Sequence, residues 1–169
     1  MKPRAPQKQQ VEVLVYYPII GSDGGYMVGE ARSVPSSAKN IPKSAIEHLI
    51  TGKPTKGSHG PYMRSINPDT KVLDLTIRKG LATVDFNRVF LDAKVIDDRQ
   101  ADLAVAAIVK TLSQFPKVKE VMIAVEGKTS GKVGGKDIED LWGSGLLKKQ
   151  PFSVSSKEKE TGQNNGSKQ

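Results

Sequence analysis

Hydrophobic and polar residues alternate most regularly in the middle of the chain, between Val72 and Gly127. Two short runs there have an apolar residue at every second position and are joined by Lys79-Gly80, a pattern typical of a tight β-hairpin with one buried face. The residues expected on that face are Leu73, Leu75, Ile77, Ala82, Val84 and Phe86. Because the pattern is dense and continuous, this stretch is expected to build the core of the fold.

An amphipathic helix and a further strand follow the hairpin. Asp97 is expected to cap the start of the helix, with Gln100 three residues later as in a capping box, and Pro116 is expected to end it. The apolar stripe of this helix consists of Ala101, Ala104, Val105, Ile108, Leu112 and Phe115. Alternation over residues 121–125 then predicts a last strand, closed by Gly127.

The N-terminal part predicts a second hairpin and a short helix. Alternation from Val11 indicates a strand that Pro18 is expected to end, and residues 26–34 form its partner strand, ended by Pro35. Gly52 stops the short helix that follows. Its apolar face consists of Ile46, Leu49 and Ile50. The order ββαββαβ predicts an α+β fold, a single domain with a mostly antiparallel sheet and two helices on one face.

Composition divides the 169 residues into a folded centre and polar ends. Only 37% of the residues are hydrophobic and 5% are aromatic, which suits a modest core with solvated tails. The expected organisation is a disordered linker over residues 1–10, the domain over 11–127, a Gly-rich extension packed on it over 128–152, and a disordered tail over 153–169.

The charge and the missing cysteine narrow the function classes. The formal net charge is +8, and most of the basic excess lies in the polar ends, where it suits contact with an anionic membrane or wall better than a nucleic-acid stripe on the domain. The absence of cysteine excludes disulfides, thiol catalysis and cysteine-based zinc sites. No apolar run approaches the roughly 18 residues of a transmembrane helix, and the first ten residues contain no signal-peptide core.

Residues able to carry catalysis are few and are expected to be structural. The two histidines, His48 and His59, do not have the spacing of metal ligands, so no metal site or cofactor is expected. The carboxylates that cluster in sequence are Asp85, Asp92, Asp97 and Asp98. Capping and surface roles explain them more simply than a paired acid and base, so the chain is not expected to be an enzyme.

Three features are candidates for contact with a partner or an anion. The turn Ser22-Asp23-Gly24-Gly25 offers backbone amides, although an ordinary turn is favoured. The segment from Gly131 to Gly134 matches a GxxG pattern, with Lys132 inside it and Lys136 after it, but no clear helix precedes it. Trp142 is either an exposed anchor or, as favoured here, part of an apolar segment that folds back on the domain.

Three motifs in order resemble the GerMN domain of sporulation and spore germination proteins. They are the GGYMVGEARSVP segment, the GLATVDFNRVF hairpin and the IVKTLSQFPKVKEVMIAVEG run, and the resemblance covers Val11 to Gly127. It implies a non-enzymatic, extracytoplasmic module, often carried by lipoproteins of Gram-positive spore-formers, that takes part in assembling an envelope-spanning channel. It also implies a fold similar to ring-building modules, which associate side by side.

The expected function is therefore protein–protein assembly in the cell envelope. The expected partners are envelope proteins, a spore channel ring among them, or further copies of the chain, with membrane attachment only through a lipid anchor absent from this sequence. One alternative is a KH-like nucleic-acid-binding module that uses Lys132 and Lys136. A second is a wall hydrolase that uses Asp85 or Asp97 with His59.

Overall fold

A long antiparallel hairpin opens the fold in the computed structural model. The part of the chain that the structure describes comprises residues 9–21, 24–38, 40–55, 62, 64, 66–92 and 98–154. Strands β1 (Gln10–Gly21) and β2 (Gly24–Pro35) pair along their whole length, which confirms the predicted first hairpin. They form a two-stranded sheet of their own instead of joining the central sheet.

The first strand does not end at Pro18, so that prediction is wrong. Leu14 on β1 directs its backbone N–H and C=O away from β2, toward the side chain of Gln114. Backbone direction alternates along a strand, so the Pro18 nitrogen also faces away from β2. The missing N–H therefore removes no bond of the ladder, and the strand continues to Gly21.

The central sheet contains four strands in the order β3-β4-β5-β8. Strands β3 (Val72–Arg78) and β4 (Leu81–Phe86) form the predicted tight hairpin, β4 pairs in parallel with β5 (Glu120–Val125), and β8 (Phe152–Ser153) adds a short antiparallel edge. A 3-10 turn, η1 (Arg88–Leu91), follows β4.

One predicted core position on β3 is wrong. Leu73 was expected to face inward with Leu75, but its side chain is 47% exposed. The strand register shifts between Val72 and Asp74, which is a β-bulge, and Val72 takes the buried position instead.

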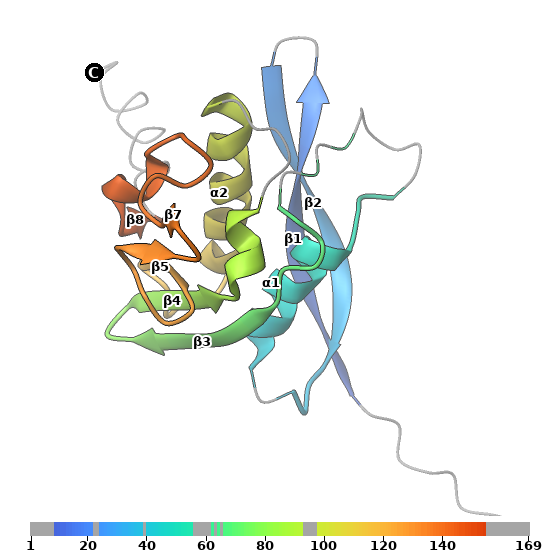
Figure 1. Ribbon diagram of the computed structural model, residues 1–169. Helices are drawn as coiled ribbons and strands as arrows, with labels where there is room; N and C mark the ends of the chain where they lie inside the picture. Colours follow the sequence, from blue (N-terminus) through green and yellow to red (C-terminus); the bar gives the residue numbers. More distant parts are fainter. Residues whose placement is uncertain are drawn as a thin grey trace, which may run out of the picture.

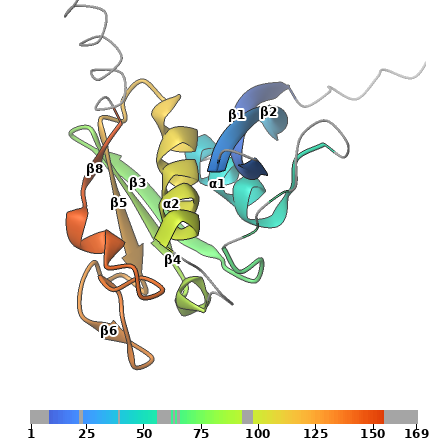
Figure 2. The same ribbon diagram turned by 90° about the horizontal axis from the view of Figure 1, so that it is seen from above.

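The two helices lie between the hairpin and the central sheet (Figures 1 and 2). Helix α1 (Ile41–Thr51) begins after Asn40, whose side chain accepts a hydrogen bond from the Lys43 amide, and Gly52 ends it as predicted. Helix α2 (Asp98–Ser113) buries the predicted stripe except for Phe115, which lies beyond the helix end and is half-buried. The expected capping residue Asp97 lies outside the described residues.

The arrangement confirms the predicted fold class, α+β with two helices and mostly antiparallel strands. Contacts from both helices to β1 and β2 show that the hairpin covers the helix layer on the side opposite the sheet (Figure 2). The core contains, fully buried, Tyr17, Ile46, Phe86, Phe90, Ile108, Leu112 and Ile123. In the described residues neither helix has the length and hydropathy needed to cross a membrane.

Two glutamine side chains close strand edges by imitating a peptide group. Gln114, just after α2, accepts a hydrogen bond from the Leu14 N–H (2.8 Å) and donates one to the Leu14 C=O (2.7 Å). Gln150 does the same for Ile123 on β5, accepting from its N–H (2.8 Å) and donating to its C=O (3.0 Å). Each amide satisfies backbone groups that an open edge would leave for another strand.

The last segment of the described chain returns to the domain. It contains a two-residue hairpin, β6 (Lys132–Val133) with β7 (Lys136–Asp137), and a short turn, η2 (Leu146–Lys149). Its buried side chains are Ile138, Leu141, Leu146 and Leu147. These side chains belong to the hydrophobic core and so hold the segment on the domain. Figure 2 shows the segment beside α2 and β5.

Candidate functional surfaces

A groove of about 390 Å³ lies between α2 and the returning segment 146–154. Figure 2 shows this helix and this segment side by side. The apolar lining of the groove comes from Val105, Ala106, Val109, Leu146, Phe152 and Val154. Its charged lining comes from Asp102, Lys110 and Lys149. An apolar floor with a few charges on the rim is the usual form of a groove that receives the side chains of a protein partner.

The groove exists because α2 is apolar on more than its core-facing stripe. Ile108 is fully buried, whereas Ala106 and Val109 are half-buried and face the groove. Pairing of β8 with β5 places Phe152 opposite Val121 and so fixes the second wall. The groove therefore has a rigid frame on both sides.

The rim charges are held in different ways. The Lys110 ammonium lies 5.0 Å from the centre of the Tyr16 ring, a cation–π arrangement that keeps it on the β1 side of the groove. Lys149 and Asp102 are exposed at the rim. The balance of these three charges is positive, which favours a partner that carries a carboxylate next to its apolar residues.

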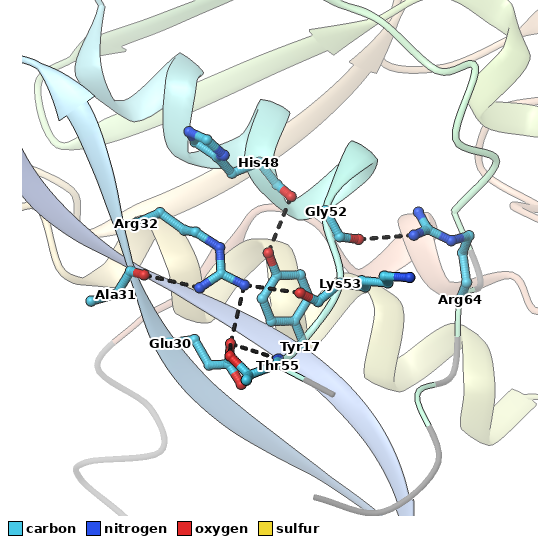
Figure 3. Close-up of polar contacts among 9 residues, drawn as sticks. All are labelled: Tyr17, Glu30, Ala31, Arg32, His48, Gly52, Lys53, Thr55 and Arg64. Atoms are coloured by element: carbon cyan, nitrogen blue, oxygen red, sulfur yellow. Dashed lines mark hydrogen bonds and ion pairs between the residues drawn. The ribbon is translucent and has the colours of Figure 1, made fainter. Parts of the chain in front are cut away.

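A second cluster joins the hairpin to the segment after α1 (Figure 3). The Arg32 guanidinium donates to the Glu30 carboxylate (3.1 Å), the Lys53 C=O (2.9 Å) and the Ala31 C=O (2.9 Å). Glu30 in turn accepts hydrogen bonds from the Thr55 N–H (2.9 Å) and hydroxyl (2.8 Å). These charge-assisted bonds fasten residues 53–55 to β2.

The other arginine of this region stabilises the end of α1. Arg64 donates to the Ile50 C=O (2.6 Å). As Figure 3 shows, Arg64 also donates to the Gly52 C=O (2.9 Å), and the Tyr17 hydroxyl donates to the His48 C=O (3.3 Å). The carbonyls at a helix C-terminus carry partial negative charge, so a cation there is favourable. The contacts of Arg32 and Arg64 are thus structural, because they fix the end of α1 and the segment after it.

Burial and hydrogen bonding shift three pKa values in this cluster. Burial by itself would raise the pKa of Glu30, but the bonds from Thr55 and Arg32 outweigh it and the pKa is lowered. Burial raises the pKa of the Tyr17 phenol, with Arg32 opposing the rise. Burial likewise raises the pKa of Tyr62, whose ring packs edge-on against Tyr17. Both phenols therefore remain neutral at physiological pH.

The predicted turn candidates are only partly described. Ser22 and Asp23 lie outside the described residues, and Gly24 opens β2. At Gly25 an added Cβ would lie 2.0 Å from Leu103 Cδ1 of α2. The role that the structure indicates for Gly25 is close packing of the hairpin against the helix.

The Gly-rich candidates lie on the β6–β7 hairpin. Residues Gly131 to Gly134 are not flanked by helices, so the geometry does not support a KH-type clamp. Lys136 forms an ion pair with Asp92, which attaches the hairpin to the end of η1. Lys132 lies instead on a basic hollow.

Trp142 is half-buried in an aromatic group. Its indole N–H donates to the Phe90 C=O (2.9 Å), and its ring lies 5.3 Å from that of Phe90, which stacks at 4.3 Å on Phe86. The indole therefore ties the returning segment to the core.

Among the carboxylates and histidines considered for catalysis, Asp85 and His48 are described by the structure and do not lie together. The Asp85 carboxylate accepts a hydrogen bond from the Gly127 N–H (2.8 Å), and Asp97 and His59 lie outside the described residues. His48 lies on α1, away from Asp85 at the end of β4. Among the described side chains, no group of three or more histidine, aspartate and glutamate residues is placed to hold a metal ion.

The sequence did not reveal the groove. Its second wall includes Phe152 and Val154, and residues from 153 onward were expected to belong to a disordered tail. The polar composition of the last residues concealed the short apolar pair that packs beside α2. Phe152 and Val154, spaced two apart, were the available signal of a short edge strand.

Comparison with known proteins gives consistent matches. Residues 14–131 match the family model Germane, described as sporulation and spore germination. The spore germination protein GerM of Bacillus subtilis is 29% identical over 119 residues, which cover 69% of this chain and 31% of that protein. The chain thus spans about a third of the length of this curated relative.

Two solved structures agree with these matches. The tandem GerMN domains of GerM from Bacillus subtilis superpose with a TM-score of 0.60 and 27% identity, covering 76% of this chain and 43% of that structure. The first GerMN domain of the same protein superposes with a TM-score of 0.53 and 26% identity, covering 76% of this chain and 95% of that structure. The described fold therefore corresponds to one such domain.

Proposed function

Because the chain belongs to the Germane family of sporulation and spore germination domains, we propose that it is a non-enzymatic module for protein–protein assembly in the cell envelope. The observation that carries this proposal is the groove between α2 and residues 146–154. We further propose an extracytoplasmic location with a lipid anchor in the full-length protein, as the resemblance to GerM-type proteins implies.

The form of the groove supports a protein ligand. Its apolar side chains lie on a rigid helix and a paired strand, so little conformational entropy is lost when a partner docks. The partner that fits is a short apolar segment with an acidic residue facing Lys149. Such a segment could belong to another copy of the chain or to another envelope protein.

The contacts of the polar residues support the absence of catalysis. Asp85 is engaged by a backbone amide and Asp92 by Lys136, so each has a structural partner. The Arg32 cluster, which contains the shifted pKa of Glu30, is accounted for by attachment of residues 53–55. A perturbed pKa in a structural network is an ordinary finding and does not require a reaction.

The experiment changes the groove in the organism that carries the gene. Ala106→Glu places a charge on the groove floor, and Lys149→Glu reverses a rim charge without altering a buried position. Arg99→Glu is the matched control, because Arg99 is exposed on the first turn of α2 and does not line the groove. Circular dichroism and thermal unfolding of the purified variants check that each one folds.

Both groove variants are expected to lower the count of heat-resistant or germinating spores and to lose a crosslink to a protein partner, whereas the control keeps both. Equal counts for groove and control variants would remove the groove as the working surface. If deletion of the gene changes neither the count of heat-resistant spores nor that of germinating spores, the assignment to sporulation and germination is wrong. Release of soluble fragments from purified cell wall by the protein would show that it is an enzyme.

A further inference from the structure

A shallow basic hollow of about 370 Å³ lies at the opposite end of β5 from β8. It is bounded by η1, by the turn after β5 and by the β6–β7 hairpin. Its lining consists of Arg88, Glu126, Lys128, Lys132, Val133 and Gly134. We call this site the Arg88 hollow, and it is separate from the groove beside α2.

The charges in the Arg88 hollow are not balanced. Three cationic side chains line it, and none of them has an ion pair or a side-chain hydrogen bond within the described part of the chain. The single carboxylate, that of Glu126, accepts a hydrogen bond from the Arg88 backbone N–H (2.8 Å). The hollow therefore holds an excess of two positive charges without an internal counter-charge.

Backbone turns form the frame around the hollow that the three cationic residues line. The turn after β5 is closed by reciprocal hydrogen bonds between Val125 and Lys128, at 2.8 and 2.9 Å. The β6–β7 turn uses Gly134 and Gly135 with φ of 57° and 80°, values that favour glycine at both positions of a tight hairpin. Like charges that line one hollow repel each other, and a bound anion would relieve that repulsion.

The ion pair of Lys136 with Asp92 completes this frame. It anchors the hairpin to the end of η1, so that Gly134 lies beside the Arg88 side chain. Of the two lysines that the sequence singled out, Lys136 is neutralised and positions the hairpin, whereas Lys132 contributes an unpaired ammonium to the hollow.

We propose that the Arg88 hollow binds a phosphate group of a phosphate ester. A guanidinium presents paired N–H donors that match two oxygens of a phosphate, and two ammonium groups supply further charge-assisted bonds. The excess of two positive charges matches the one to two negative charges that a phosphate ester carries near neutral pH. The site is open and shallow, so it takes the phosphate alone and leaves the rest of the ester in solvent.

Two arms of one experiment separate the sources of that phosphate. In the first arm, glycerol 3-phosphate is titrated into the full chain at low salt, and amide chemical shifts of Lys128 and Gly134 are followed. In the second arm, cosedimentation is measured with vesicles of phosphatidylglycerol and of phosphatidylcholine. Binding in the first arm assigns a soluble ester, and binding to the anionic vesicles alone assigns a lipid headgroup.

The variants are Arg88→Gln and Lys132→Gln, with Lys117→Gln as the matched control. Lys117 is an exposed lysine at the other end of the domain, before β5, so its variant has the same net charge change. We expect about tenfold weaker binding for each hollow variant, the loss typical of one charge-assisted contact, and unchanged binding for the control.

Equal weakening by the control would reduce the effect to overall charge and overturn the proposal. So would the absence of shifts and of sedimentation in both arms. Preference for a single-stranded RNA over both phosphate probes, with the same sensitivity at Lys132, would replace the proposal with a nucleic-acid site. All three substituted side chains are exposed and unbonded in the described structure, so the variants are expected to fold.

Discussion

Replacement of Gln114 tests whether a single side-chain amide closes the edge of β1. This amide accepts from the Leu14 N–H, donates to the Leu14 C=O and also donates to the Thr111 C=O (2.6 Å). Gln114→Met keeps the shape of the side chain and removes all three hydrogen bonds. A neutral hydrogen bond contributes about 1 kcal/mol net, and part of the exposed edge is resolvated, so we expect a loss of about 2 kcal/mol in unfolding free energy. In a domain of this size that loss lowers Tm by roughly 4–8 °C.

The glutamate variant sharpens the test. Gln114→Glu keeps an acceptor for the Leu14 N–H but turns a carboxylate oxygen toward the Leu14 and Thr111 carbonyls. Folding then disfavours the charged form, so the folded-state pKa of the new carboxyl rises above its usual value of about 4.3. The unfolding free energy of this variant, compared with that of Gln114→Met, is therefore expected to be highest below about pH 4. It should fall as the pH rises from the unfolded-state pKa of about 4.3 through the higher folded-state pKa.

Hydrogen exchange at the Leu14 amide is the decisive measurement. Its exchange is expected to accelerate in Gln114→Met by more than the loss of global stability explains, because the local bond is missing even in the folded state. Gln150→Met is the matched control, since it makes the same chemical change at the β5 edge and should accelerate exchange at Ile123 instead. Unchanged exchange at Leu14 in a folded Gln114→Met protein would refute the reasoning.

Three further predictions concern stability. Glu30→Gln is expected to cost about 1–3 kcal/mol of unfolding free energy at pH 7. Because the folded pKa of Glu30 is lowered, the difference from wild type should shrink as the pH falls below the ordinary glutamate pKa of 4.5. Urea titrations from pH 7 to pH 3 measure this difference, and a constant difference would contradict the assigned cause. Ile108→Ala empties a fully buried position and should lower the unfolding free energy by about 2–5 kcal/mol. Leu73→Ala changes an exposed side chain at the bulge and should lower it by less than about 1 kcal/mol. Equal losses in chemical denaturation would count against the described β3 register. Trp142→Phe removes the hydrogen bond to the Phe90 C=O and should cost about 1 kcal/mol by thermal unfolding, and no loss at all would show that this bond is dispensable.

Periodicity determined most of the fold because it records which face of each element is buried. The stripe of α2 from Ala101 to Leu112 and the inward residues of β4 were predicted position by position. Lys79-Gly80 predicted the β3–β4 turn, and both residues have positive φ. Local rules failed where a backbone detail was invisible in sequence, as with the bulge that exposes Leu73 and the outward-facing nitrogen of Pro18.

The surfaces proposed for function were decided by tertiary structure alone. Each surface joins segments that are distant in sequence. Val109 and Phe152 both line the groove, and Arg88 and Lys132 both line the hollow. No spacing of residues along the chain predicts that these segments lie together. Their proximity depends on which sheet edge the returning segment pairs with and on how the β6–β7 hairpin is anchored. The sequence by itself determined the two long hairpins, the two helices, the strand β5, most of the inward residues and the family resemblance. The separation of the strands into two sheets around a helix layer was set by packing, which satisfies the apolar faces of both helices at once.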